Sequence, residues 1–460
     1  RMHSISTIIL IFSLCIGIAD CSKADDPGPL FIICDESPNE LCSCTKHTVS
    51  CSNARVEQEE LGLFKKLDTL NVILPKSEFI PTRALFDHNA IVHINRFMLS
   101  GMENITELNL SHNKISRIDD DSFLRFPNIS KLYLQNNQLD NVRRGWFDSI
   151  SDSLQLLDLS SNKIKNMDPD AFINFVNLKK LIFDSNPISA QSQIALSFLE
   201  SLEVLSLDDC DIKELDSKTF KSLKNLTKLS LRNNLLKKVP QGIVKELDLN
   251  ALDLSGTLID EIPTNAFAGA SEITTLYLED MPNLKVIHEC AFCGMDSLKH
   301  ISFSKSSQIE QLHPNAFGFK DNFHLSKIET LDISWTNITL EKSLLDYGKL
   351  RNFIATDVLF DCGCDKKFLR KIPSLRDIRC DSPKSLSGRL ITELDSDEMC
   401  LEVVRSRRFF FGLFGAIISV FVLTIVFILC RLRRQRKKNP AHSKAESVRQ
   451  AYALLTTTKL

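Results

Sequence analysis

The sequence lacks the residue patterns from which common enzyme sites are built. Glycine accounts for only 15 of 460 residues, and none of these glycines stands in a nucleophile-elbow or phosphate-loop pattern. A His-Glu-x-x-His zinc motif is also missing, and the ten histidines are scattered. We therefore expect no enzyme activity, no cofactor and no resident metal.

Basic charge is scarce outside the last thirty residues. The whole chain has a formal net charge of −2, and residues 431 to 460 contain nine Lys or Arg and one Glu. Subtracting +8 for this tail from −2 leaves −10 for residues 1 to 430. A nucleic-acid partner is therefore not expected, because attraction to anionic lipid explains the basic tail sufficiently.

By contrast, one sequence motif, here called the phrase, is present and returns about every 24 residues. One copy reads Ile105-x-x-Leu108-x-Leu110-x-x-Asn113-x-Ile115, and further copies start at Ile129, Leu154, Leu178, Leu202 and Leu226. The alternating leucines predict a short strand with one apolar face. A single repeat cannot bury that face alone, so neighbouring repeats must stack. The phrase is that of leucine-rich repeats, and it predicts an α/β-type solenoid, a horseshoe with short parallel strands on its concave face.

The asparagine of each phrase is expected to pair with backbone groups at the bend after the strand. Cys210 occupies this position once, and we interpret it as a buried structural thiol. Thr257, Met281, Ser306 and Thr336 replace the asparagine later in the chain. We therefore expect ten or eleven turns within residues 61 to 350, an irregular strand within residues 67 to 73, and a looser second half.

Cysteines gather at both ends of the repeats. The front cluster is Cys34, Cys42, Cys44 and Cys51, and the back cluster is Cys362, Cys364, Cys380 and Cys400. These clusters resemble the caps of extracellular leucine-rich repeat proteins, here residues 34 to 60 and 360 to 400. Spacing alone allows three pairings in each cluster. The resemblance implies Cys34–Cys44, Cys42–Cys51, Cys362–Cys380 and Cys364–Cys400.

A further pair, Cys290 and Cys293, has three interpretations. The two residues can form a local disulfide or remain as buried thiols, and they can also bind a metal together with His288. The first two are favoured in the oxidising compartment that the other cysteines indicate.

Two apolar segments predict how the chain is placed in a membrane. Residues 1 to 24 have the features of a signal peptide. Residues 409 to 430 are uncharged and long enough to cross a bilayer about 30 Å thick. The basic residues behind them predict a cytoplasmic tail, residues 431 to 460, after a linker at residues 401 to 408. We therefore expect a single-pass type I protein of the plasma membrane.

Short motifs predict modification and trafficking. Five sequons place candidate N-glycans at Asn104, Asn109, Asn128, Asn225 and Asn337. Tyr452-x-x-Leu455 has the form of an endocytic signal, and Thr458-Lys-Leu460 that of a PDZ ligand. The tail partners would be an endocytic adaptor or a PDZ domain.

The variable positions between the strand leucines predict the binding face. The candidate residues are Tyr133, Gln135, Asp158, Asp184, Asp208, Arg232, Asp253, Tyr277, Glu279 and Trp335. Their acids favour a partner with a basic patch, and their aromatics are candidate anchors. The resemblance to single-pass extracellular leucine-rich repeat membrane proteins implies a recognition or adhesion receptor for a protein ligand. An innate-immune pattern receptor and a matrix organiser are the alternatives.

Overall fold

The computed structural model describes residues 31–34, 41–58, 63–68, 70–74, 80–96, 98–319, 327–372, 375, 378–438 and 449. The predicted signal peptide and the tail motifs at Tyr452, Leu455, Thr458 and Leu460 lie outside these ranges. The chain divides into two compact units. One unit comprises residues 1–358 with 371–375, and the other residues 359–370 with 376–460.

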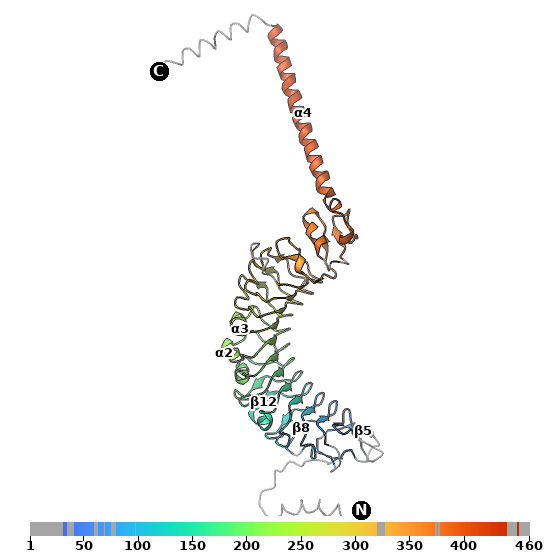
Figure 1. Cartoon of the computed structure of the whole chain (residues 1–460), viewed down its shortest axis with the longest axis vertical. Helices are drawn as coiled ribbons and strands as arrows, with labels where there is room; N and C mark the ends of the chain where they lie inside the picture. The colour runs from blue at the N-terminus through green and yellow to red at the C-terminus, as the bar shows by residue number, and fades with distance from the viewer. Residues whose placement is uncertain are drawn as a thin grey trace, which may run out of the picture. The chain divides into compact units, whose positions relative to one another are not determined.

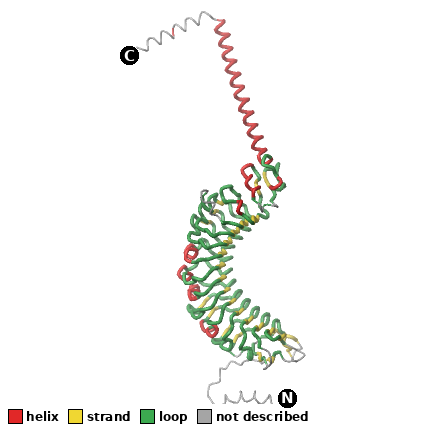
Figure 2. The backbone as a smooth tube through the Cα atoms, in the orientation of Figure 1, coloured by secondary structure: helices red, strands yellow, loops and turns green. Residues whose placement is uncertain are grey.

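The first unit is built on one long sheet, which has fourteen strands within the described residues. A short antiparallel pair, β2 (Ser43–Cys44) and β3 (Thr48–Ser50), starts this sheet. Parallel strands follow in chain order: β7 (Arg83–Leu85), β9 (Glu107–Asn109), β11 (Lys131–Tyr133), β13 (Leu156–Asp158), β15 (Lys180–Ile182), β16 (Val204–Ser206), β17 (Lys228–Ser230), β18 (Ala251–Asp253), β20 (Thr275–Tyr277), β22 (His300–Ser302), β24 (Thr330–Asp332) and β25 (Asn352–Ile354). Figure 2 shows the strands along the inner edge of this curved unit.

The register of the sheet stacks the repeat leucines into one apolar spine. Leu108 pairs with Leu132, and Leu132 pairs with Leu157. All three side chains are completely buried. Phenylalanines of the return segments, the parts of each repeat that run back to the next strand, close the core from the other side; those completely buried include Phe123, Phe147, Phe172, Phe220 and Phe267. The predicted solenoid with short parallel strands is confirmed.

The return segments form shorter elements of their own. Paired strands there are β8 (His93–Ile94) with β10 (Arg117–Ile118), β12 (Asn141–Val142) with β14 (Asn166–Met167), and β19 (Glu261–Ile262) with β21 (Val286–Ile287) and β23 (Gln311–Leu312). Helical turns are η2 (Arg144–Trp146), η3 (Asp148–Ile150), η4 (Ala190–Phe198), α2 (Ser217–Phe220), α3 (Gln241–Glu246) and η6 (Tyr347–Lys349). Figure 1 places α2 and α3 on the outer edge of the curve.

Two expectations about the repeats need correction, whereas the number of turns does not. Eleven parallel strands, β7 to β24, lie within residues 61 to 350 among the described residues, which agrees with the ten or eleven turns expected there. The segment from Leu67 supplies β6 (Val72–Ile73), which pairs with β1 (Phe31–Ile32) outside the main sheet. The second half is also not looser at its strands, because the parallel register continues without a shift from β18 to β25. Leucine alternation alone maintains that register.

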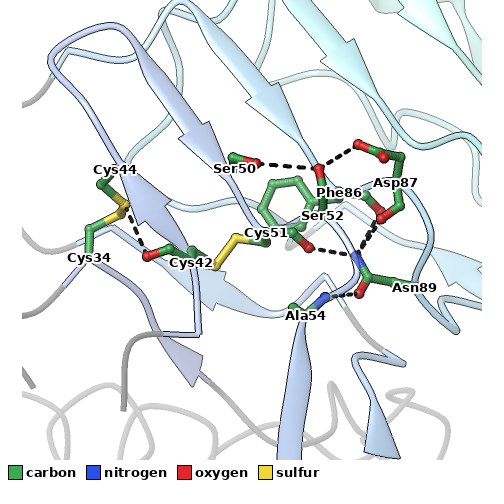
Figure 3. Close-up of a disulfide and its surroundings, with 10 residues drawn as sticks. All are labelled: Cys34, Cys42, Cys44, Ser50, Cys51, Ser52, Ala54, Phe86, Asp87 and Asn89. Atoms are coloured by element: carbon green, nitrogen blue, oxygen red, sulfur yellow. Dashed lines mark hydrogen bonds between the residues drawn. A yellow bond between two sulfur atoms is a disulfide. The ribbon is translucent and has the colours of Figure 1, made fainter. Parts of the chain in front are cut away.

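The front cysteine cluster is joined directly to the first repeat (Figure 3). Cys34 is bonded to Cys44 and Cys42 to Cys51, which are the pairs that the resemblance implies. The amide nitrogen of Asn89 donates to the Cys51 carbonyl at 2.8 Å, and its oxygen accepts from the Ala54 N–H at 2.8 Å. A hairpin of β4 (Arg55–Gln58) and β5 (Leu63–Lys66) follows this cluster.

The second unit contains the other cysteine cluster and a long helix. Cys362 is bonded to Cys380 and Cys364 to Cys400, again the pairs that the resemblance implies. Its elements are β26 (Phe360–Asp361), β27 (Cys380–Ser382), η7 (Cys364–Lys371), η8 (Ile391–Glu393), η9 (Glu398–Cys400) and α4 (Leu401–Lys438). Within α4, the stretch Gly412–Arg434 is long and apolar enough to cross a membrane. The helix and the disulfides fit a membrane-anchored outer domain.

Candidate functional site

The concave face is formed by the last residue of each strand, such as Tyr133 of β11, and by the residue two positions later. In the register, Tyr133 lies beside Asp158, and Asp253 lies beside Tyr277. Strands about 4.8 Å apart place Tyr133 and Tyr277 about 30 Å from each other, because six strand steps separate them. The face therefore offers a surface of protein size, with its two tyrosines well apart.

Two neighbouring carboxylates lie at the centre of this face. Asp184 accepts the backbone N–H of Asp208 at 2.9 Å, and Asp208 accepts that of Arg232 at 2.9 Å. Ser230 donates its hydroxyl to Asp208. Burial raises the pKa of Asp184, and burial together with the charge of Asp184 raises the pKa of Asp208 to about 6. The side chains that fix the turns are thus the same acids that a ligand would meet.

Arg232 pairs with two adjacent acids of another repeat. Its guanidinium lies 3.6 Å from the Glu279 carboxylate and donates to Asp280 at 3.2 Å. All of these side chains are partly exposed, so the network contributes modestly to stability. The positive charge predicted at this point is therefore already paired, and Glu279 faces a ligand as part of an ion pair.

The remaining candidate binding residues differ in whether their side-chain oxygens are already hydrogen-bonded. Asp158 accepts both the N–H and the hydroxyl of Ser160, and Asp253 accepts the N–H of Ser255. Both carboxylates are therefore used in closing their own turns. Gln135 is half-buried, and its side-chain oxygen is buried without a partner among the described residues.

The aromatic residues are the accessible anchors. Tyr277 is 38% exposed and Trp335 is 45% exposed, whereas Tyr133 is half-buried. Burial and the charges of Glu107 and Asp158 raise the pKa of Tyr133. Trp335 donates its indole N–H to Asp357 at 2.7 Å, within the first unit. This hydrogen bond therefore restrains the indole at the edge of the face.

The sequence analysis missed a row of residues, here called the ridge, along the edge of the face that follows the strands. In each repeat the ridge residue comes directly before the asparagine position and has a left-handed backbone. Its φ is 54° at His112, 56° at Asp209, 51° at Asp280 and 53° at Trp335. The N–H of each donates to a carbonyl of the next repeat, as His112 does to Gln135 at 2.9 Å. Asn, Asp, Ser, His and Gly, which tolerate this conformation, fill most of the ridge, so its signal was present in the sequence.

The opposite edge is basic, which the sequence analysis also missed. The first residue of the strands is exposed Arg83, Lys131, Lys180 and Lys228 in four repeats. Arg83 and Lys131 both lie near Glu107, the first residue of β9, at 3.0 and 4.0 Å. The face therefore carries cations at the first strand residue of four repeats and carboxylates at its inner positions. The expected acids are thus joined by cations that lie outside the two inner positions of each repeat that the expectation considered.

The structure decides the bonding state of Cys290, Cys293 and Cys210. Cys290 and Cys293 form a disulfide, and the His288 ring contacts Glu261 at 3.1 Å. Cys210 is completely buried, and burial raises the pKa of its thiol to about 12. Among the described residues, no group of three or more His, Cys, Asp or Glu is arranged to hold a metal ion.

Comparisons with known proteins agree with this fold. A leucine-rich repeat profile matches residues 86–139 and 127–188, and a BspA-type leucine-rich repeat profile matches residues 192–324 and 260–356. No curated protein sequence matches the chain. Neither profile indicates a catalytic family.

Two solved structures share the architecture. The TLR13–ssRNA13 complex aligns at 23% identity with a TM-score of 0.50, over 60% of this chain and 39% of that chain. The octameric complex of Latrophilin 3, Unc5D and FLRT2 aligns at 19% identity with a TM-score of 0.52, over 77% of this chain and 97% of that chain. At these identities the likeness shows the fold alone. The chain is thus a leucine-rich repeat solenoid protein, with repeats matched from residue 86 to residue 356.

Proposed function

We propose that this protein is a cell-surface recognition or adhesion receptor that binds a protein ligand on its concave face. The observation that carries the proposal is the exposed pair of aromatics, Tyr277 and Trp335, on a face where several aspartates are already used in closing the turns. Aromatic side chains supply much of the binding energy at protein interfaces. The size of the face suits a protein better than a metabolite.

The charges of the face favour a particular kind of ligand. Asp184, Asp208 and Glu279 repel phosphate backbones, which argues against a nucleic acid. A protein with a basic strip opposite these acids, and acids opposite Lys131, Lys180 and Lys228, would match both edges. FLRT2 in the octameric complex is a leucine-rich repeat protein assembled with protein partners. Its likeness to this chain is compatible with such a role.

The proposal includes a type I orientation at the plasma membrane. The signal peptide, the Gly412–Arg434 span and the basic residues behind it support it. The sequon side chains of Asn104, Asn128, Asn225 and Asn337 are exposed, as glycosylation requires. Asn109 differs, since it is half-buried and lies within β9 on the concave face. We therefore propose that the concave face is free of glycan.

Proximity labelling on living cells tests the binding face. The full chain carrying a peroxidase is compared with its Tyr277→Ala/Glu279→Ala variant and with Leu124→Ala, a control at an exposed return-segment position. We expect the double variant to lose at least one labelled surface protein that the control retains, with both variants displayed as well as wild type. An unchanged set of labelled proteins in the double variant would remove the centre of the concave face from the proposal.

Glycosidase treatment tests the orientation. Removing N-glycans from the full chain should lower its apparent mass, and Asn109→Gln should leave that shift unchanged. A chain without any glycan would contradict an outward-facing solenoid.

A further inference from the structure

The Cys290–Cys293 disulfide differs from the other four in what it joins. It links residues only three apart, whereas the end-cluster bonds span 9, 10, 18 and 36 residues. A bond that closes so short a loop restricts the unfolded chain least. Both of its cysteines are half-buried. This bond therefore stabilises the fold least while remaining within reach of solvent.

The preceding repeat forms the same turn without any sulfur, and the following repeat forms a closely related one. Residues 265–268 and 315–318 have the same Ala-Phe centre, flanked by Asn265 and Ala268 or by Asn315 and Gly318. The closing N–H···O=C bond is 3.1 Å in both of these turns and 3.3 Å between Cys293 and Cys290. The backbone φ is 58° at Asn265 and 56° at Cys290. The turn therefore does not depend on the disulfide.

Contacts with the adjoining repeats hold this turn in place independently. The Cys290 N–H donates to the Asn315 carbonyl, and the Phe292 N–H donates to the Ala316 carbonyl, both at 2.9 Å. The Phe292 ring stacks between Phe267 and Phe317, at centroid distances of 5.7 and 4.8 Å. Opening the disulfide consequently leaves both the turn and the core beneath it in position.

A hollow of about 140 Å³ is lined by one of the two cysteines. The described residues that line it include Phe292, Cys293, Met295, Asp296, Phe317 and Lys327, whereas Cys290 does not line it. The hollow leaves room next to Cys293 for a thiol-bearing side chain, whose thiolate is the nucleophile in exchange. Lys327 and Asp296 place one positive and one negative charge at its wall, so the hollow distinguishes Cys293 from Cys290 by access rather than by charge.

We propose that Cys290–Cys293 is a reversible thiol-exchange site on the return side of the solenoid. The thiolate of an external thiol attacks the Sγ of Cys293, a mixed disulfide forms there, and the Cys290 sulfur leaves as a thiolate that takes a proton from water. Attack of the Cys290 thiolate on that mixed disulfide expels the external thiol and closes the bond again. The site lies away from the concave face and is independent of the ligand proposed for it.

Graded reduction of the full chain in detergent micelles tests the site. The oxidised protein is incubated with increasing reduced glutathione, quenched in acid, alkylated and analysed by peptide mass spectrometry. We expect a glutathione adduct on Cys293 and open Cys290–Cys293 while Cys42–Cys51, Cys362–Cys380 and Cys364–Cys400 are still closed and the circular dichroism is unchanged. Opening only together with those three bonds, or with loss of the dichroism signal, would overturn the proposal.

Single-cysteine variants test which sulfur is attacked. Cys290→Ser leaves Cys293 free, and its matched control Cys293→Ser leaves Cys290 free. With oxidised glutathione, we expect Cys293 to form the mixed disulfide several-fold faster than Cys290, and equal rates would refute the role of the hollow. The double variant should keep its thermal midpoint and form no adduct in this turn; an unfolded double variant would show that the bond is structural. A protein thiol as the true partner would appear as a mass adduct on Cys290→Ser isolated from cells.

Discussion

In the first half of the solenoid, from Asn89 to Asn234, a buried amide bridges neighbouring repeats at every such position except Cys210, whereas in the second half Thr257, Met281, Ser306 and Thr336 stand there. Asn137 illustrates the first half, since its oxygen accepts from Ile115 N–H at 2.9 Å and its nitrogen donates to Leu110 and Leu134 carbonyls at 3.0 Å. Thr257 donates to Leu254 in its own repeat at 2.8 Å. Ser306 still bridges to the preceding repeat, since its hydroxyl donates to the Leu278 carbonyl at 2.8 Å and accepts from the Met281 N–H at 3.1 Å.

The second half replaces these bridges on its return side. There β19, β21 and β23 form a continuous three-stranded sheet, and Phe267, Phe292 and Phe317 stack from repeat to repeat. The strand register is the same in both halves. The difference teaches that the leucine spine fixes the register, while cohesion between repeats can come from either edge.

Removing one buried asparagine amide should have the largest effect on stability. The loss should also differ in size between the two halves of the solenoid. Asn186→Ala leaves the Ile164 N–H and the Leu159 and Phe183 carbonyls without their partner, which should cost about 3 kcal/mol of unfolding free energy. Thr257→Val removes mainly one bond within its own repeat and should cost about 1 kcal/mol. Urea unfolding of both variants checks this, and equal losses would contradict the comparison.

The buried acid of the first half should make stability depend on pH. Because the pKa of Asp208 rises from 3.8 to about 6 on folding, its ionisation opposes folding, and its contribution to stability falls as pH rises between these values. Asp208→Asn should therefore be more stable than wild type above pH 6 and equal to it below pH 3.8. The gain should be smaller than the loss at Asn186, since solvent partly screens the carboxylate. A gain that is the same at every pH would refute this origin.

Restoring an amide at Cys210 should extend the first half. The Cys210 thiol makes weak contacts with Phe183 and Asp208 carbonyls at 3.4 and 3.3 Å. Cys210→Asn should replace them with amide bonds and raise the unfolding free energy by about 1 kcal/mol. Thermal unfolding, with Cys210→Ala as the control, measures the change. A destabilised Cys210→Asn variant would show that the position is too small for the amide.

Relieving the backbone strain at Trp335 should give the smallest change in stability. It should also clearly weaken ligand binding. Trp335 has a left-handed backbone that asparagine accepts at lower cost, as Asn136 and Asn233 do in the first half. Trp335→Asn should therefore gain up to about 1 kcal/mol, offset in part by loss of the Asp357 bond. Under the proposed function it should also bind less ligand. A variant that is less stable yet binds normally would mean that the indole serves packing alone.

The sequence predicted what depends on period and on side-chain type. Leucines such as Leu108 alternate because only one strand face is buried, so both the fold and its register were foreseeable. The return-side sheet was not, because strands of two residues such as β21 (Val286–Ile287) leave too short a pattern. The pairing of Arg232 with Glu279 and Asp280 was not predicted either. It joins residues 47 and 48 positions apart in the sequence, and it depends on how far the arginine side chain extends.

Site-specific photo-crosslinking on living cells tests the central claim most directly. A benzophenone amino acid is placed at Tyr277 on the concave face or at Leu124 on the return side, both of which are exposed. Irradiation should join the full chain to another protein from position 277 and not from position 124. Adducts from position 124 alone, or from neither position on cells that display the protein, would contradict a concave protein-binding face.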